Sequence, residues 1–265
     1  SLATMSGAVL LVPLIDNFGW QTMLVVCGLG GMTVTIPLLY LFIYNTPEES
    51  PHISNEEAAF IRSNLEQGES ESTDWSFLKM PLLWLAACGA ILNNYCIYGI
   101  LNWLPTYFVI QKKIDFSELA VAASLPYVAG FFGFVISAYL GDKTGRRILL
   151  CSLGFTVSTV FIFLATIAPG LWPTIAAFSV ATLFQSAYIC QEFAIIQRIL
   201  PSAVIGKAVG VYNGCSMLIG GVGGTVMLGQ IVSVTGNYNH GLYSIIVATS
   251  LGAIVMFTLS RLVKY

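Results

Sequence analysis

The sequence predicts an all-α protein that crosses a membrane several times. Hydrophobic residues make up 56% of its 265 residues and charged residues only 9%, and the mean hydropathy is +0.80. Soluble domains do not have this composition. A helix that spans the bilayer needs about 20 consecutive, mostly apolar residues. Seven stretches meet that requirement, and they cover residues 22–44, 82–110, 118–140, 148–168, 172–197, 208–234 and 241–262.

An eighth apolar stretch, residues 1–15, reaches about two thirds of the length of a span. Because the chain begins with Ser1 rather than methionine, we expect this stretch to be the end of a helix that starts upstream. It lacks the basic leading region and the small-residue cleavage site of a signal peptide.

The basic residues predict the orientation of the spans, since lysine and arginine accumulate in short cytoplasmic loops. If residues 45–81 are cytoplasmic, alternation leaves only Lys112 and Lys113 on the outer side. The central loop and the C-terminus are then cytoplasmic, in a multi-pass protein of the inner or plasma membrane. The basic residues on the cytoplasmic side are Arg62, Lys79, Lys143, Arg146, Arg147, Arg198, Lys207, Arg261 and Lys264.

Residues 45–81 interrupt the apolar pattern and are rich in acidic side chains. Within them, Ser54-Asn55-Glu56-Glu57 has the spacing of a capping box, in which the serine side chain and Glu57 satisfy each other's backbone donors. The sequence therefore predicts a short helix over residues 55–66, in a water-facing connector between two helical bundles.

A tight turn between two predicted spans carries the sequence Gly141-Asp142-Lys143-Thr144-Gly145-Arg146-Arg147. Gly141 and Gly145 permit a reversal that is too tight for side chains, and Asp142 is placed to accept hydrogen bonds. The turn resembles the cytoplasmic loop signature of the major facilitator superfamily of secondary transporters, although Lys143 replaces an arginine of that signature and Ala138 replaces a glycine. A plain turn that follows the positive-inside rule is the alternative interpretation.

This resemblance implies a fold of two six-helix bundles, with the solute site at mid-depth between them. It implies that residues 1–44 are the last one and a half helices of the N-terminal bundle, and that residues 45–81 are the cytoplasmic central loop. Residues 82–265 are then the C-terminal six-helix bundle. About four helices of the plan are missing at the front, so we expect this chain to be a fragment that needs them for transport.

Softer matches point to the anion:cation symporter branch of the superfamily. They are Phe18-Gly19-Trp20-Gln21, in which glutamine replaces the usual arginine, Trp103-Leu104-Pro105-Thr106-Tyr107, and Gly210 with Asn213 followed by Gly220-Gly221. The branch implies symport of a small organic anion, such as a sugar acid or carboxylate, with H⁺ or Na⁺ by alternating access.

The family also implies a gating role for the turn, whose aspartate braces a neighbouring helix while its basic residues stabilise one state. Pseudo-symmetry nominates Arg198 and the helix start near Gly206-Lys207 as the partners of Asp142. The predicted gating residues are Gly141, Asp142, Gly145, Arg146, Arg147 and Arg198.

Polar residues at membrane depth are expensive unless they face a cavity or a partner, and two stripes of them recur at helical spacing. Asn94, Tyr98 and Asn102 share one face of the span 82–110, with Asn93 beside them. In the span 172–197, one face carries Thr182, Gln185, Tyr188 and Glu192. We expect Asn94, Tyr98, Asn102, Gln185 and Tyr188 to line the path of a solute, with interhelical hydrogen bonding as the competing interpretation.

Glu192 is a candidate for ion coupling, because a carboxylate inside a span can bind a proton or a cation. The alternative is an interfacial anchor. About 1.5 Å of rise per residue from Trp172 places Glu192 about 30 Å down, near the cytoplasmic boundary, where Arg198 can help to solvate it.

Other classes of protein fit the sequence less well. The six cysteines lie in apolar spans without metal-ligand spacing, so we expect no metal, no cofactor and no enzymatic nucleophile. His52 and His240 lie in loops, and no basic patch suggests nucleic acid. A seven-span retinal receptor would need a mid-span lysine for its Schiff base, and no span has one. A non-transporting, sensor-like or degenerate remnant of a transporter remains the alternative function.

Overall fold

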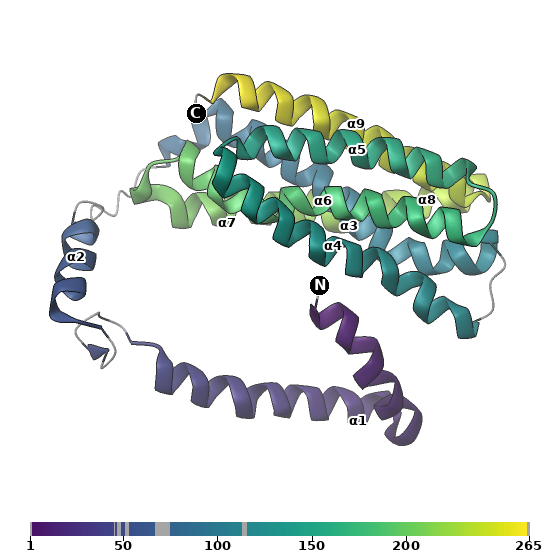
Figure 1. The fold of residues 1–265 in the computed structure, drawn as a ribbon, viewed down its shortest axis with the longest axis horizontal. Coiled ribbons are helices and arrows are strands. Elements are labelled where there is room, and N and C mark those ends of the chain that lie inside the picture. Colours follow the sequence, from purple (N-terminus) through teal and green to yellow (C-terminus); the bar gives the residue numbers. More distant parts are fainter. Residues whose placement is uncertain are drawn as a thin grey trace. The chain divides into compact units, whose positions relative to one another are not determined.

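A computed structural model describes residues 2–44, 46, 49–50, 53–66, 75–112 and 116–263. The chain forms two compact units, of which Ala3–Ser72 is one and Thr73–Tyr265, with Ser1–Leu2, is the other. Every regular element among the described residues is helical (Figure 1). The predicted all-α class is therefore confirmed.

The first unit contains α1 (Leu2–Phe42) and α2 (Asn55–Glu66). Gly19 breaks α1 into two helical segments, because its φ of 79° and ψ of 161° are not helical and suit only glycine. This break lies between the two apolar stretches that the sequence separates. The capping-box helix is confirmed, since α2 begins at Asn55 and the backbone N–H of Glu57 donates to Ser54 Oγ at 3.2 Å.

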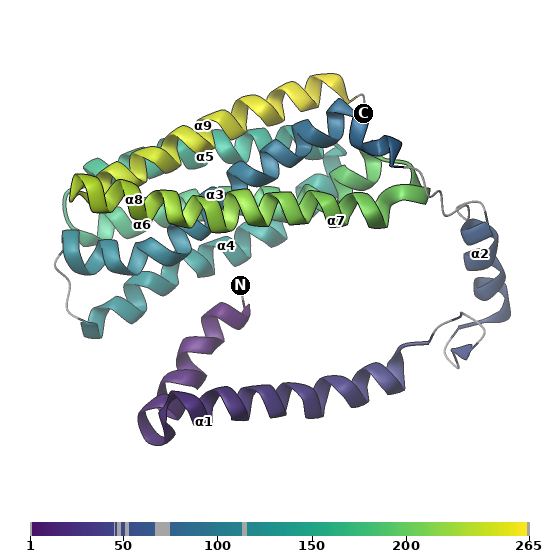
Figure 2. The ribbon, with the colours of Figure 1, turned by 180° about the vertical axis from the view of Figure 1, so that it is seen from behind.

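The second unit is a bundle of six spans that alternate in direction (Figures 1 and 2). Its longer helices are α3 (Pro81–Lys112), α4 (Phe116–Thr144), α5 (Arg147–Ile167), α6 (Leu171–Ile199), α7 (Ile205–Cys215), α8 (Gly224–Thr235) and α9 (Tyr238–Leu262). Short 3₁₀ turns precede α3 and α7, at Ser76–Lys79 and Ser202–Val204.

Among the described residues, seven helices are long and apolar enough to cross a membrane, as the sequence predicts. The first of them is the Asn17–Phe42 part of α1, and the other six form the bundle. With alternating directions, the α4–α5 turn and the starts of α3 and α7 share one end of the bundle. The protein is an integral, multi-pass membrane protein.

Glycines set the closest helix contacts in the bundle. A Cβ added to Gly133 of α4 would overlap the backbone of Leu183 in α6 and lie 2.8 Å from the Leu183 Cα. In the same way, a Cβ added to Gly154 of α5 would lie 2.5 Å from the carbonyl oxygen of Phe184 in α6. Because α6 touches both neighbours backbone to backbone, α4, α5 and α6 form a closely packed unit.

A π-helical segment, η4 (Ser216–Gly223), joins α7 to α8 in one continuous rod (Figure 2). Buried positions recur every four residues along this rod, at Ala208, Tyr212, Ser216, Gly220, Gly224 and Leu228. An α-helix of 3.6 residues per turn would drift by about 40° for each step of four, or about 200° over five steps. The wider π turn removes much of this drift, so both ends of the rod bury the same face against α3.

Candidate functional site

Tyr98, from the polar face of α3, lines an open groove on the surface of the bundle. Asn94 and Tyr98 are half-buried and Asn102 is exposed, and the Asn102 amide donates to Thr225 Oγ1 of α8 at 3.4 Å. The groove has a volume of about 390 Å³. It is lined by Tyr98, Met217, Gly221, Val222, Thr225 and Val226. Of these six residues only Tyr98 and Thr225 have polar side chains, so the groove is a largely apolar space with two neutral hydrogen-bonding groups in its lining.

The predicted lining residues on α6 lie elsewhere. Gln185 is 3% exposed and donates its amide to Asn93 Oδ1 of α3 at 2.7 Å. Tyr188 is also buried, and its hydroxyl lies 2.9 Å from that of Tyr212 and donates to the Ala86 carbonyl at 3.2 Å. In this conformation both side chains tie helices together and do not face the groove.

Glu192 lies one turn beyond Tyr188 on α6 and is partly buried. It is near enough to Tyr188 and Tyr212 for electrostatic interaction. This setting suits either ion binding or anchoring.

The charged turn lies between α4 and α5, at the end of the bundle where α7 begins. Gly145 has a φ of 67°, which supports its predicted role in the reversal. Asp142 pairs with Arg147 at 2.6 Å, and the nomination of Arg198 as a further partner stays a prediction. Arg198 is exposed in the last turn of α6, and Arg146 is the residue that precedes α5.

Gly141 does not shape the turn, because it belongs to α4 and its φ is not positive. The space that a Cβ would take there holds the amide group of Gln191, whose Cδ would lie 2.7 Å away. Gln191 is fully buried and accepts a hydrogen bond from Arg147. The sequence analysis missed this residue, and its position next to Glu192, near the end of an apolar span, was the available signal.

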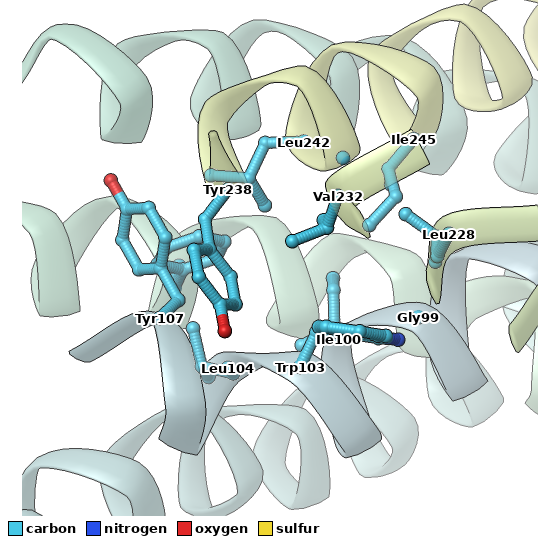
Figure 3. Close-up of a pocket in the computed structure, with 12 residues that line it drawn as sticks. Gly99, Ile100, Trp103, Leu104, Tyr107, Leu228, Val232, Tyr238, Leu242 and Ile245 are labelled. Carbon is cyan, nitrogen blue, oxygen red and sulfur yellow. The ribbon is translucent and has the colours of Figure 1, made fainter. Parts of the chain in front are cut away.

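A second pocket, between α3, α8 and α9, is almost entirely apolar (Figure 3). Its volume is about 20 Å³, which holds one water molecule at most. The rings of Trp103 and Tyr238 lie beside it, with centroids 5.9 Å apart. The pocket is therefore a packing defect at the end of the bundle opposite the charged turn, and it has no room for a solute.

All six cysteines are free, and Cys96 and Cys151 are buried as expected of core residues. Cys190 and Cys215 are half-exposed. Within the described ranges, no group of three histidine, cysteine or acidic side chains is arranged to hold a metal ion.

Comparison with known proteins decides the family. The sequence model of the Major Facilitator Superfamily matches residues 1–225. The chain belongs to the major facilitator superfamily. The fold agrees with that of a bacterial homologue of the human lysosomal transporter Spinster, solved in an inward-facing, unoccupied conformation. The TM-score is 0.61 at 17% identity, over 98% of this chain and 64% of the solved one.

Curated members of the superfamily align along most of this chain. The probable galactarate/D-glucarate transporter GudP of Bacillus subtilis is 25% identical over 93% of this chain and 57% of its own length. The probable sulfoacetate transporter SauU of Cupriavidus necator is 25% identical over 90% of this chain and 58% of its own length. The chain thus spans less than three fifths of the length of these relatives, both named as probable transporters of organic anions.

Proposed function

We propose that this chain is the C-terminal part of a secondary active transporter for a small organic anion, such as a sugar acid or a carboxylate. Transport is coupled to H⁺ or Na⁺ and proceeds by alternating access. The polar face of α3 carries the proposal, because Tyr98 lines an open groove and Asn102 donates to Thr225, which also lines it. Exposed polar groups in a span are costly unless they serve a polar path.

The groove suits the uncharged part of such a solute. None of its lining residues carries a charge, whereas amide, phenol and hydroxyl groups can both donate to and accept from the hydroxyls of a sugar acid. The positive charge that neutralises the carboxylate then comes from the part of the transporter that this chain does not span. Glu192 is the proposed coupling carboxylate on this side.

The superfamily plan also supports a proposed division of the chain. Residues 1–44 end the N-terminal bundle, residues 45–81 form the cytoplasmic central loop, and residues 82–265 form the C-terminal bundle. The positive-inside rule supports this orientation, since the α4–α5 turn, Arg198 and Lys207 then lie in the cytoplasm.

Uptake of radiolabelled D-glucarate by the full-length form in proteoliposomes tests the function. We expect accumulation above the external concentration when a proton or sodium gradient is imposed, and inhibition by unlabelled galactarate. Sulfoacetate as a second competitor tests whether the site prefers hydroxyl-bearing anions. Binding of D-glucarate without accumulation under either gradient would instead support the non-transporting alternative.

Replacement of Asn94 or Asn102 by alanine should raise the KM for the transported anion. Loss of one neutral hydrogen bond costs about 0.5–1.5 kcal/mol, so the expected rise is roughly threefold to tenfold with little change in kcat. Concentration series of initial uptake rates measure it. Gln230→Ala, at an exposed position of α8 outside the groove lining, is the matched control. An unchanged KM for both asparagine variants would argue that this face only binds helices together.

A further inference from the structure

We propose that Gln191 is the positioning residue that holds the charged turn on α6, and that it carries more of this hold than Asp142 does. The inference deepens the proposed transport function, on which it rests for its biological meaning. It concerns the contact that keeps α4, α5 and α6 together at the end of the bundle where the turn lies.

Gln191 joins three helices through a fully buried amide. Its Oε1 accepts from Arg147 Nη1 of α5 at 2.8 Å, and its Nε2 donates to the Ser137 carbonyl of α4 at 2.6 Å. An arginine can only donate and a carbonyl can only accept, so these two partners fix which way the amide points. Gln191 uses both of its functional groups in this network, each toward a different neighbouring helix.

The guanidinium of Arg147 donates hydrogen bonds to two partners, the buried Gln191 and the exposed Asp142. Its Nη2 donates to Asp142 Oδ1 at 2.6 Å, but the side chain of Asp142 is 73% exposed. Water screens an exposed ion pair and leaves it little net energy. A buried hydrogen bond to a charged group is stronger, and breaking it strands polar groups away from water. The bond between Arg147 and Gln191 is partly buried and the less exposed of the two, so we expect it to contribute more to the contact.

Gly141 completes the arrangement. A side chain at this position would take the place of the Gln191 amide and displace it, so the glycine provides clearance for that amide and not a turn conformation. Gly141, Arg147 and Gln191 thus act together, and a change in any one of them should loosen the turn from α6.

Cys190 provides a reporter next to this contact. Its thiol is half-exposed and lies 3.8 Å from Gln191 Nε2. When the turn separates from α6, Cys190 becomes more accessible to a water-soluble maleimide. The rate of labelling therefore reports local opening without any solute being present.

The experiment uses the full-length protein in liposomes, with Cys190 as its single cysteine. We expect Gln191→Leu to raise the maleimide labelling rate about tenfold, and Asp142→Asn to raise it less than threefold, since a hydrogen bond to a charged group is worth more when buried. Gln191→Glu keeps the acceptor for Arg147 but loses the donor to the Ser137 carbonyl, so its rate should fall between those of the parent and Gln191→Leu. Gln197→Leu, at an exposed position of the same helix, is the matched control and should have no effect.

A labelling rate for Asp142→Asn that equals or exceeds the rate for Gln191→Leu overturns the proposal, and so do equal rates in all variants. If Gln191→Leu does not accumulate as folded protein, Gly141→Ala displaces the same amide and carries the same expectation. Thermal melting in detergent separates local opening from general unfolding, because only a general loss of stability lowers the melting temperature in proportion to the labelling rate. Failure of D-glucarate uptake with the labelling pattern intact contradicts the proposed function and leaves this inference standing.

Discussion

Replacement of Gly133 by alanine is expected to cause the largest loss of stability of any single methyl addition described here. The new Cβ would lie 2.8 Å from the Cα of Leu183. The end of a flexible side chain could move aside, but the backbone of a packed helix cannot. Overpacking of a core costs about 1–3 kcal/mol and sometimes more. Separation of α4 from α6 should therefore lower the melting temperature and the yield of folded protein, which fluorescence-detected size exclusion after heating would measure.

The matched control is Gly210→Ala, in the exposed face of α7. A Cβ on Gly210 meets nothing within 4 Å, and alanine favours a helix interior over glycine by about 0.5–1 kcal/mol. This variant should be as stable as the parent or slightly more stable. If Gly133→Ala melts like Gly210→Ala, the close contact between α4 and α6 is not what holds the bundle.

The second large effect should come from the buried amide pair of α3 and α6. Replacing Asn93 by leucine leaves the Gln185 amide without its partner at 1–3% exposure, and a stranded buried polar group costs about 1–3 kcal/mol. Gln185→Met alone should cost a similar amount. The double variant should recover most of the loss, because replacing both partners by apolar groups of similar shape is nearly neutral. Melting temperatures of the four proteins form the double-mutant cycle.

The exposed pair of Asn102 and Thr225, at 3.4 Å, is the control cycle and should show almost no coupling. Additive losses for Asn93 and Gln185 would contradict an interhelical tie. They would favour the prediction from the sequence, in which Gln185 faces the solute, since Gln185 Oε1 is buried without a partner among the described residues.

Much of the fold was predictable because membrane helices leave strong signals in a single sequence. Apolar length alone predicts the seven spans, and the capping box locates the start of α2 to the residue. Gly19 belongs to the motif Phe18-Gly19-Trp20-Gln21, but nothing in the sequence shows that its φ is positive. The sequence also carries no sign that Ser216–Gly223 would be π-helical, since this segment contains the same small and apolar residues as the neighbouring α7 and α8.

The candidate site was predicted only in part, because helical spacing shows which residues share a face and not what that face meets. Tyr98 lines a groove, whereas Tyr188 bonds Tyr212. Gln191 was missed because its partners, Arg147 and Ser137, are 44 and 54 residues away in sequence. Contacts over such separations depend on how the helices pack.

The four-residue burial pattern of α7, η4 and α8 also governs which sequence changes this span can accept. Its outer face has the same period, with exposed residues at Gly206, Gly210, Gly214, Leu218, Val222, Val226, Gln230 and Val234. In a saturation scan of residues 206–234, tolerance should rise and fall every four positions and not every 3.6. A deletion of one residue within α7 or α8 would put their buried faces out of phase, so natural length variation should concentrate in Ser216–Gly223, where the extra turn width can absorb it.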